Sequence, residues 1–381
     1  MPPDETSWRE TIEGIDVLCG EDRLAELGGL ARELSGHRAL VVGDPGITAA
    51  GYCDRALGAL RSAGLGARLF DAVAENPTSN DVRAGVEAAR ELDADLIVGL
   101  GGGSAMDCAK GINILYTNGG EMADYQGFGK PSEPLLPSIG IPTTAGTGSE
   151  AQSFALITDP TTHAKMACGD TQARFRAVIL DPTVTDTLPR TTAAAAGLDA
   201  IAHAVESHVT TRRSAASARL SKAAWDALDR YLEAAFEAIG DRHLWGRLQV
   251  AAFLAGAAIE RSMLGAAHAL ANPLTSRYGT THGVAVALML PHVVRYNGTH
   301  AEALYAELAE GVDGETAAET LAGRVEVLRG AVGMPARLRD VGVPHDDLTD
   351  LADDAGRQWT LGFNPRPARR DNLVRLYETA Y

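Results

Sequence analysis

The sequence predicts a protein with two structurally different halves, an α/β half built on a parallel sheet and then an all-helical half. In the first half, amphipathic stretches alternate with short runs of β-branched residues at 38–43, 67–70, 95–100, 138–142 and 178–180. Such alternation is typical of a parallel sheet covered by helices. After about residue 190 the strand signals nearly vanish, and Ala/Leu-rich stretches such as 214–238 and 245–261 predict helices. We therefore predict an α/β domain over residues 1–190 and an all-α domain over residues 191–381.

Length and composition narrow the class of protein. The 381 residues exceed what one hydrophobic core usually organises, which favours two domains. A formal net charge of −16 without a Lys/Arg-rich run argues against binding to nucleic acid or to an anionic membrane. The sequence has no apolar run long enough to cross a bilayer and no signal-peptide pattern in its first twenty residues, so we expect a cytoplasmic protein. Scattered cysteines argue against a disulfide framework and a thiolate zinc site: Cys19, Cys53, Cys108 and Cys168.

The best-defined helix of the first half covers 80–92, after a turn and cap at Pro77 and Thr78. Its apolar residues recur at helical spacing, at Val82, Val86, Ala89 and Leu92. Helices of this kind between the strand runs support the α/β assignment.

Gly101, Gly102, Gly103 and Ser104 lie between the strand DLIVGL and the helical stretch MDCAKGINIL. Glycines here leave backbone N–H groups uncovered at a helix N-terminus, where the helix dipole favours an anion such as a pyrophosphate. The spacing differs from G-x-G-x-x-G, and Lys110 does not follow a glycine as in a P-loop. The glycines alone are equally consistent with a tight turn that binds nothing.

A second polar turn, PTTAGTGSE at 142–150, follows another predicted strand. Two such turns at neighbouring strand ends converge on the sheet edge where open α/β sheets bind ligands, which favours a cofactor site. Asp44 follows the first clear strand, where a carboxylate can bind the adenosine ribose and repel a 2′-phosphate, so it favours NAD over NADP. By itself Asp44 is as consistent with a turn former ahead of Pro45 and Gly46.

Asp199 and His203 lie at i and i+4 in the helical segment GLDAIAHAVES, so one ion can bind both side chains. Such a pair alone is more often plain helix surface or a buried polar contact. Further along, His268 and His282 lie in apolar surroundings, and each alone is more often a satisfied core histidine.

Pro273 and Gly279 are expected to break the helix between these two histidines, so that His282 begins a new helix that turns back toward His268. The resulting set of one carboxylate and three imidazoles suits Fe(II) or Zn(II). An ion in such a site can acidify an alcohol or polarise a carbonyl, which assists hydride transfer.

Ordered motifs along the whole chain resemble the iron-containing (group III) alcohol dehydrogenase family, which includes lactaldehyde reductases and propanediol dehydrogenases. They are GGGSAMDCAK, PTTAGTGSE, the lysine of THAKM, GLDAIAHAVES, HALANPLTSRYGTTHG, LPHVVRYN and NPRPARRDNLVRLY. The resemblance implies a Rossmann-like dinucleotide-binding domain, an all-helical metal domain of the dehydroquinate synthase-like architecture, and an active site in the cleft between them. It also implies a homodimer or larger homo-oligomer.

The resemblance assigns roles to individual residues. The metal ligands it implies are Asp199, His203, His268 and His282, with His282 also close to the nicotinamide. The cofactor contacts it implies are Asp44, Asn76, Gly102, Gly103, Ser104, Asp107, Thr143, Thr144, Thr147, Phe154, Lys165 and the stretch 183–188, which includes Thr183, Thr187 and Leu188.

Asn272 departs from the family pattern, because many members have a second histidine four residues after the equivalent of His268. That histidine is often assigned to proton relay or substrate binding. Asparagine forms hydrogen bonds but does not titrate near neutral pH. We expect the proton to travel through the nicotinamide ribose hydroxyl and water, and Asn272 to reshape the substrate pocket.

The sequence therefore predicts a metal-dependent, NAD-linked alcohol dehydrogenase or aldehyde reductase that acts on a small primary alcohol or aldehyde, with Fe(II) the first choice of metal and Zn(II) the second. The alternatives on the same scaffold are a cofactor-recycling transhydrogenase and a glycerol-type polyol dehydrogenase. A non-catalytic nucleotide or metal sensor is disfavoured because all four ligand positions are filled.

Overall fold

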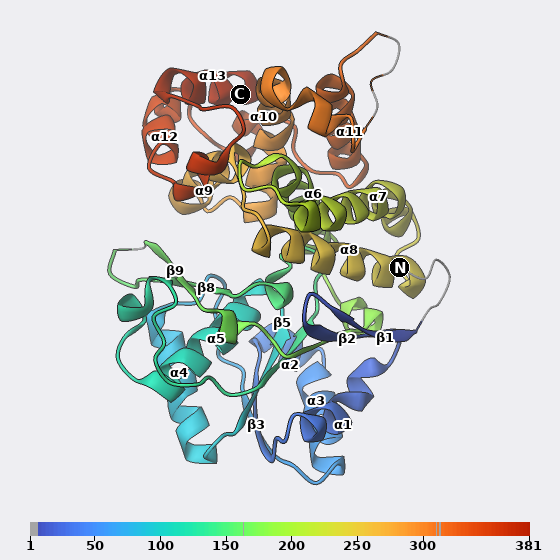
Figure 1. Ribbon diagram of the computed structural model, residues 1–381, viewed down its shortest axis with the longest axis vertical. Helices are drawn as coiled ribbons and strands as arrows, with labels where there is room; N and C mark the ends of the chain where they lie inside the picture. The colour runs from blue at the N-terminus through green and yellow to red at the C-terminus, as the bar shows by residue number, and fades with distance from the viewer. Residues whose placement is uncertain (1–6, 163, 310, 312–313) are drawn as a thin grey trace. The chain divides into compact units, whose positions relative to one another are not determined.

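The computed structural model describes residues 7–162, 164–309, 311 and 314–381. The chain forms two compact units, Met1–Thr144 with Ser149–Leu188, and Ala145–Gly148 with Pro189–Tyr381 (Figure 1). The short segment 145–148 thus belongs to the second unit although the chain on both sides of it belongs to the first. No helix among the described residues is long and apolar enough to span a membrane.

The first unit contains a seven-stranded sheet with the strand order β1-β2-β10-β7-β5-β3-β4. Apart from the antiparallel pair β1–β2, all neighbouring strands are parallel, which confirms the predicted sheet type. β4 lies on one side of β3 and β5 on the other, so the chain reverses direction across the sheet between β3 and β5. The strands are β1 (Trp8–Ile12), β2 (Ile15–Cys19), β3 (Arg38–Val42), β4 (Gly66–Phe70), β5 (Leu96–Gly101), β7 (Ser138–Pro142) and β10 (Ala177–Leu180).

The predicted strand runs of the first half all form strands, whereas β1, β2 and a second, three-stranded sheet were not predicted. The second sheet has the order β6-β9-β8 and consists of β6 (Gly127–Phe128), β9 (Lys165–Gly169) and β8 (Phe154–Thr158). Five helices accompany the strands in the described part of this unit: α1 (Leu27–Glu33), α2 (Pro45–Ala49), α3 (Tyr52–Ser62), α4 (Ser79–Leu92) and α5 (Gly103–Asn118).

Helices cover both faces of the large sheet. Side chains of α1 and α3 pack with Val41 and Val98 in one buried cluster. Gly99 points to the opposite face, because successive strand residues alternate, and a Cβ there would lie 3.2 Å from Met106 of α5. α4 begins as predicted, with Thr78 and Asp81 forming a reciprocal capping box.

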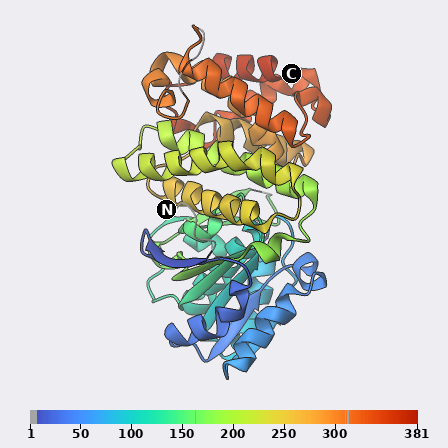
Figure 2. The same ribbon diagram turned by 90° about the vertical axis from the view of Figure 1, so that its right-hand side faces the viewer.

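The second unit contains helices and no strands among its described residues, as Figure 2 shows for the yellow-green to red part of the chain. Its helices are α6 (Arg190–Val209), α7 (Ala215–Glu237), α8 (Arg242–Glu260), α9 (Ala266–Tyr278), α10 (His282–Tyr305), α11 (Ala317–Ala331), α12 (Leu348–Ala355) and α13 (Arg370–Ala380). This confirms the predicted all-α half.

The prediction that Pro273 breaks the helix after His268 is wrong, because α9 continues through Pro273. An interior proline costs about 3 kcal/mol, but Leu270 and Leu274 on either side are fully buried. Burial of one leucine contributes about 1.5–3 kcal/mol, so the two together outweigh that cost. Gly279 ends the helix with a φ of +65°, and His282 begins α10 as predicted.

Candidate active site

Several of the predicted cofactor residues lie beyond strand ends at one edge of the large sheet: Asp44 after β3, Asn76 after β4, Gly102 after β5, Thr143 after β7 and Thr183 after β10. These five strands are connected through parallel pairings. Asp107 lies within α5 instead, and Phe154 and Lys165 begin strands of the second sheet. Residues after the ends of parallel strands lie on the same sheet edge, and ligands of open α/β sheets bind where the strand order reverses. Here that position lies between β3 and β5, beside Asp44 and the glycine turn.

The glycine turn leads directly from β5 into α5. Gly101 has a φ of +150°, and a Cβ there would lie 2.7 Å from the Cβ of Ala105 and 3.1 Å from Asp44 Oδ2. Gly102 is the N-cap of α5 and provides no side-chain cap, so the first N–H groups of a 16-residue helix are available to an anion. Ser104 Oγ accepts a hydrogen bond from the backbone N–H of Asn76 at 3.3 Å, which ties two predicted cofactor residues together.

Asp44 combines both roles that the sequence left open. Its Oδ1 accepts a hydrogen bond from the backbone N–H of Ile47 at 3.0 Å and so caps α2. Its Oδ2 is the atom beside Gly101. A cap and a ribose contact can therefore use different oxygens of one carboxylate, and the ribose contact stays a prediction.

Asp107 is engaged by protein groups at both of its oxygens. It accepts hydrogen bonds from Ser149 Oγ at 2.5 Å and from the backbone N–H of Leu156 at 3.2 Å. Burial raises the pKa of Asp107 although Lys110 lies 3.7 Å away. The geometry favours a structural role, so the cofactor contact implied for Asp107 remains a prediction.

Lys110 is a buried residue whose role the sequence analysis did not identify. Its Nζ donates to Ser149 O and Oγ at 2.7 and 2.9 Å and to the carbonyl of Phe154 at 2.8 Å. These bonds tie α5 to the segment that enters β8, so Phe154 is held through its backbone. Among the other predicted cofactor residues, Thr183 is buried and its carbonyl accepts from Tyr52 Oη, whereas Lys165 begins β9 and is exposed.

Thr147 belongs to the second unit, unlike Thr143 and Thr144. The glycines beside it are required by close packing in that unit. A Cβ at Gly148 would lie 2.6 Å from the Cα of Gly256 in α8, and a Cβ at Gly146 would lie 2.5 Å from the Cβ of Ala196 in α6. These two glycines therefore allow the segment to lie against two helices.

The predicted metal ligands come together in the second unit. Asp199 and His203 lie one turn apart on α6, His268 is the third residue of α9, and His282 is the first residue of α10. Asp199 Oδ1 lies 3.3, 3.5 and 3.8 Å from the Nε2 atoms of His203, His268 and His282. One carboxylate oxygen thus faces three imidazole nitrogens from three helices.

The chemistry of this cluster fits a divalent ion. Asp199 Oδ1 and His268 Nε2 are buried and have no hydrogen-bond partner among the described residues. Possible ligand atoms of Asp199, His268 and His282 all lie within 4.8 Å of one another. Separately satisfied core histidines would not leave buried polar atoms without partners. The geometry brings all four residues together, and their role as ligands stays a prediction.

The electrostatics of the cluster follow from burial and mutual contact. Burial alone would raise the pKa of Asp199, but the neighbouring imidazoles hold it below its ordinary value. Burial lowers the pKa of His203. Burial acts against the charged form of His268 as well, yet the carboxylates of Asp199 and Glu206 raise its pKa to about 9. The two carboxylates make the site favourable for positive charge.

Comparison with known protein families accounts for both halves of the chain. The model of the iron-containing alcohol dehydrogenase family matches residues 15–182, and its C-terminal model matches residues 193–381. The chain belongs to the iron-containing alcohol dehydrogenase family. It is a metal-dependent oxidoreductase that acts on the CH–OH group of alcohols and on the corresponding aldehydes.

Individual relatives of this family member cover almost its full length. Alcohol dehydrogenase 4 of Schizosaccharomyces pombe is 36% identical over 95% of this chain and 87% of its own. The lactaldehyde reductase of Escherichia coli K12 is 33% identical over 91% of this chain and 92% of its own. The structure of sulfoacetaldehyde reductase from Bifidobacterium kashiwanohense with NAD+ has a TM-score of 0.88 at 25% identity, covering 98% of both chains.

Asn272 of this family member lies on α9 one turn beyond His268. Its Nδ2 donates a hydrogen bond to Gln358 Oε1 at 3.0 Å. Gln358 immediately precedes Trp359, whose ring meets that of Phe363 edge to face and which is 52% exposed. A neutral amide pair thus occupies the position for which the resemblance led us to expect a histidine in the family pattern.

Glu206 is a further residue that the sequence analysis missed. It follows His203 by three residues on α6 and is 3% exposed, and its Oε2 lies 2.6 Å from His268 Nδ1. The i, i+3 spacing from His203 places Glu206 on the same side of the helix, which was a usable signal.

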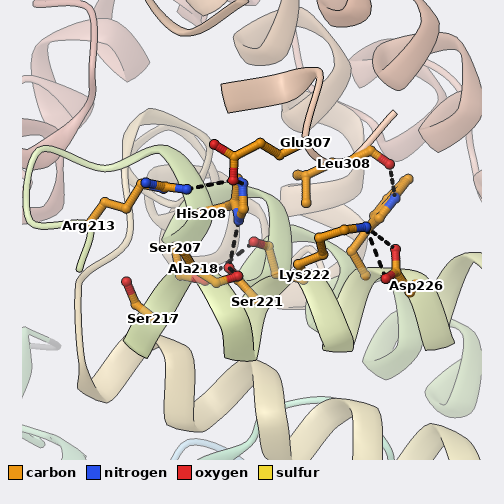
Figure 3. Close-up of polar contacts among 12 residues, drawn as sticks. Ser207, His208, Arg213, Ser217, Ala218, Ser221, Lys222, Asp226, Glu307 and Leu308 are labelled. Carbon is orange, nitrogen blue, oxygen red and sulfur yellow. Dashed lines mark hydrogen bonds and ion pairs between the residues drawn. The ribbon is translucent and has the colours of Figure 1, made fainter. Parts of the chain in front are cut away.

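His208 of this family member lies in a separate cluster of polar side chains (Figure 3). His208 Nδ1 is 2.8 Å from Ser221 Oγ, and its Nε2 is 3.3 Å from Glu307, which also accepts from Arg213 at 2.6 Å. The order serine, imidazole, carboxylate resembles a nucleophilic triad. However, His208 and Ser221 are both fully buried, so no substrate can reach the hydroxyl. The cluster joins α6 and α7 to the turn that follows α10.

Proposed function

We propose that this protein transfers hydride between NAD(H) and a small primary alcohol or aldehyde at an iron centre held by Asp199, His203, His268 and His282. In this proposal residues 1–190 bind the dinucleotide and residues 191–381 bind the metal. The observation that carries it is the approach of one buried carboxylate oxygen to three imidazole nitrogens within 3.8 Å. Location in the cytoplasm and assembly as a homodimer or larger homo-oligomer remain predictions.

The residues present support this division of labour. A bound divalent ion would supply a Lewis acid that polarises the C–O bond of the substrate. Asp199 and His203 project from consecutive turns of one helix, so their spacing is rigid. The His282 side chain is 32% exposed, whereas those of His203 and His268 are 6% and 4% exposed, so His282 is the ligand most open to substrate.

The dinucleotide preference rests on Asp44 and on a relative. The N–H groups at the start of α5 suit a pyrophosphate, and the carboxylate beside Gly101 would repel a 2′-phosphate. The sulfoacetaldehyde reductase structure contains NAD+. We therefore propose NAD in preference to NADP.

Asn272 affects both the proposed route of the proton and the shape of the substrate pocket. Its amide cannot exchange a proton near neutral pH, and it is held by Gln358. We propose that Asn272 shapes the substrate pocket and carries no proton itself. A bound nicotinamide ribose and water would then have to supply the proton for the substrate oxygen. An Asn272→His variant should change both the pH profile and the substrate preference, and an enzyme unchanged in both would refute this role.

The decisive experiment uses metal-free protein reloaded anaerobically with Fe(II) or with Zn(II). A panel of short aldehydes and alcohols is then tested with NADH, NADPH and their oxidised forms. We expect Fe(II)-dependent oxidation of NADH by aldehydes, and a chelator should abolish it. His203→Ala should remove activity, whereas the control His300→Ala, which replaces an exposed histidine of α10, should retain it. Folded protein that is inactive with both metals across the panel would refute the proposal.

A further inference from the structure

Glu206 has an unusual set of partners for a buried carboxylate. Its Oε1 accepts a hydrogen bond from the backbone N–H of Ala267 at 2.7 Å. Its Oε2 lies 2.6 Å from His268 Nδ1 and 3.4 Å from the backbone N–H of His268. One carboxylate from α6 therefore caps the first turn of α9 and also holds the imidazole of that turn.

The contact with Nδ1 determines which ring nitrogen of His268 can act as a ligand. A carboxylate only accepts hydrogen bonds, so Nδ1 must carry a proton. In the neutral imidazole Nε2 then bears the lone pair. His268 Nε2 lies 3.5 Å from Asp199 Oδ1 and has no hydrogen-bond partner among the described residues. When the ring is neutral, as a metal ligand must be, the nitrogen that faces the cluster is therefore the one that bears the lone pair.

The position of Glu206 is fixed by its surroundings. A Cβ at Gly265 would lie 3.0 Å from Glu206 Oε1 and 3.1 Å from Asn364 Oδ1. Asn364 and Asn297 donate to each other at 2.7 and 3.0 Å, and Asn364 Oδ1 also accepts from the backbone N–H of Ala266 at 3.3 Å. The NPRP segment at 364–367 therefore helps to hold the first turn of α9 in place beside Glu206.

We propose that Glu206 is a positioning residue of the metal centre, which fixes the ring orientation and tautomer of His268 so that Nε2 is free to bind the ion. This inference rests on the proposed metal ligands. Carboxylates that accept from the second nitrogen of a ligand histidine raise its basicity, and their loss typically weakens metal binding by about 10- to 100-fold.

Glu206→Gln removes the negative charge and one of the two acceptor oxygens while it preserves the size of the side chain. A glutamine has one acceptor oxygen and one NH2 group. If the oxygen faces His268, the NH2 group opposes the N–H of Ala267. If the NH2 group faces His268, Nδ1 must become the acceptor and the proton moves to Nε2, where it blocks the ligand position.

Glu302 provides a matched control in the same unit. Its oxygens accept hydrogen bonds from the N–H groups of Ala317 and Ala318 at the start of α11, and this capping contact involves no imidazole. Glu302→Gln therefore reproduces the loss of a carboxylate cap without the change at a histidine.

The test measures Co(II) and Zn(II) affinity of full-length metal-free protein by competition with a chromogenic chelator. Glu206→Gln should bind 10- to 100-fold more weakly than wild type, with an altered Co(II) absorption spectrum, whereas Glu302→Gln should bind within twofold of wild type. Equal affinity and an unchanged Co(II) spectrum in Glu206→Gln would overturn the inference. His268→Ala distinguishes the two proposals: if it also binds normally, the ligand set is wrong, and if it alone binds weakly, only the role of Glu206 is wrong.

A second measurement needs no folded variant at position 206. In zinc-loaded wild-type protein labelled with 15N at histidine, the His268 resonance, assigned by its absence in a His268→Asn variant, should show a proton on Nδ1. A proton on Nε2 instead would overturn the inference.

Discussion

Gly283, the residue after His282, allows α10 to approach α6 closely. A Cβ at this position would lie 1.9 Å from the carbonyl oxygen of Ala195 and 2.6 Å from its carbonyl carbon. Real Cβ atoms essentially never come within 3.0 Å of such atoms, so Gly283→Ala must move the two helices apart by about 1 Å, the difference between 3.0 and 1.9 Å. His282 begins α10 and must move with it.

The size of the effect follows from the identity of the clashing atom. Overpacking costs about 1–3 kcal/mol, and a backbone carbonyl within a helix cannot rotate away, so we expect the upper end. The gain in helix propensity offsets at most about 1 kcal/mol. A net loss of about 2 kcal/mol corresponds to a melting temperature lower by about 4–8 °C for a unit of this size.

Metal binding should suffer more than stability. Ligand distances in metal sites are held within about 0.2 Å, so a displacement of about 1 Å removes His282 as an effective ligand. We expect affinity for Zn(II) to fall at least about 100-fold, which is about 2.7 kcal/mol.

The assay combines thermal unfolding, without and with metal, and a chelator-competition titration. Gly323→Ala in α11 is the control, because a Cβ there meets nothing within 4 Å. The control should be as stable as wild type or more stable, with normal metal affinity. A Gly283→Ala variant that matches this control in both measurements would refute the reasoning about helix approach.

Three further predictions concern the ligand carboxylate, the dinucleotide and a buried histidine. Asp199→Asn removes a charge from a predicted ligand, so it should weaken metal binding by more than the roughly 10- to 100-fold loss typical of residues that only hold a ligand; chelator competition that gives the wild-type affinity would contradict its role. Asp44→Asn keeps the oxygen that caps α2 but removes the negative charge. The ratio of kcat/KM with NADPH to kcat/KM with NADH should therefore rise by about tenfold, or 1.4 kcal/mol, with little change in melting temperature. An unchanged ratio would show that the charge does not select the cofactor. Burial and then Arg213 lower the pKa of His208 to about 4. The unfolded chain, with a pKa near 6.5, therefore binds more protons than the folded protein between about pH 4 and 6.5, and stability is lost as the pH falls through this window. His208→Asn should reduce the slope of the unfolding free energy against pH in this window by up to about 1.4 kcal/mol per pH unit. Burial also lowers the pKa of His292 to about 4, so His292 should still contribute to the slope in the variant. Urea unfolding at stepped pH values that gives an unchanged slope would contradict this prediction.

The parts of the fold that could be predicted are those whose secondary structure is indicated by the local sequence. The apolar run DLIVGL becomes the fully buried strand β5, and Thr78 caps α4 in the way that its sequence suggests. β1 was missed because the residues of WRETI are exposed or half-buried in an edge strand, so they lack a hydrophobic pattern. Pro273 misled because the burial of Leu270 and Leu274 on both sides of it is a property of the folded protein, which the local sequence does not show.

The candidate site likewise has features that the local sequence predicts and features that depend on distant parts of the chain. The i, i+4 spacing of Asp199 and His203 is a local property, so the pair could be predicted. The roles of Gly148 and Gly283 could not, because the atoms that require glycine belong to α8 and α6, distant along the chain. The partners of Asp107 and Lys110 likewise depend on where β8 lies against α5.

The positions of the predicted ligands also explain why the cluster needs carboxylates. His268 and His282 lie in the first turns of α9 and α10, and helix N-termini carry partial positive charge. A buried divalent cation beside two such termini would be unfavourable unless nearby negative charge compensated it. Asp199 supplies one negative charge beside the Nε2 atoms of the imidazoles. Glu206 supplies a second negative charge at Nδ1 of His268 and at the backbone N–H of Ala267. The two carboxylates together balance a doubly charged ion, so removal of either should weaken its binding even though only Asp199 faces all three imidazoles.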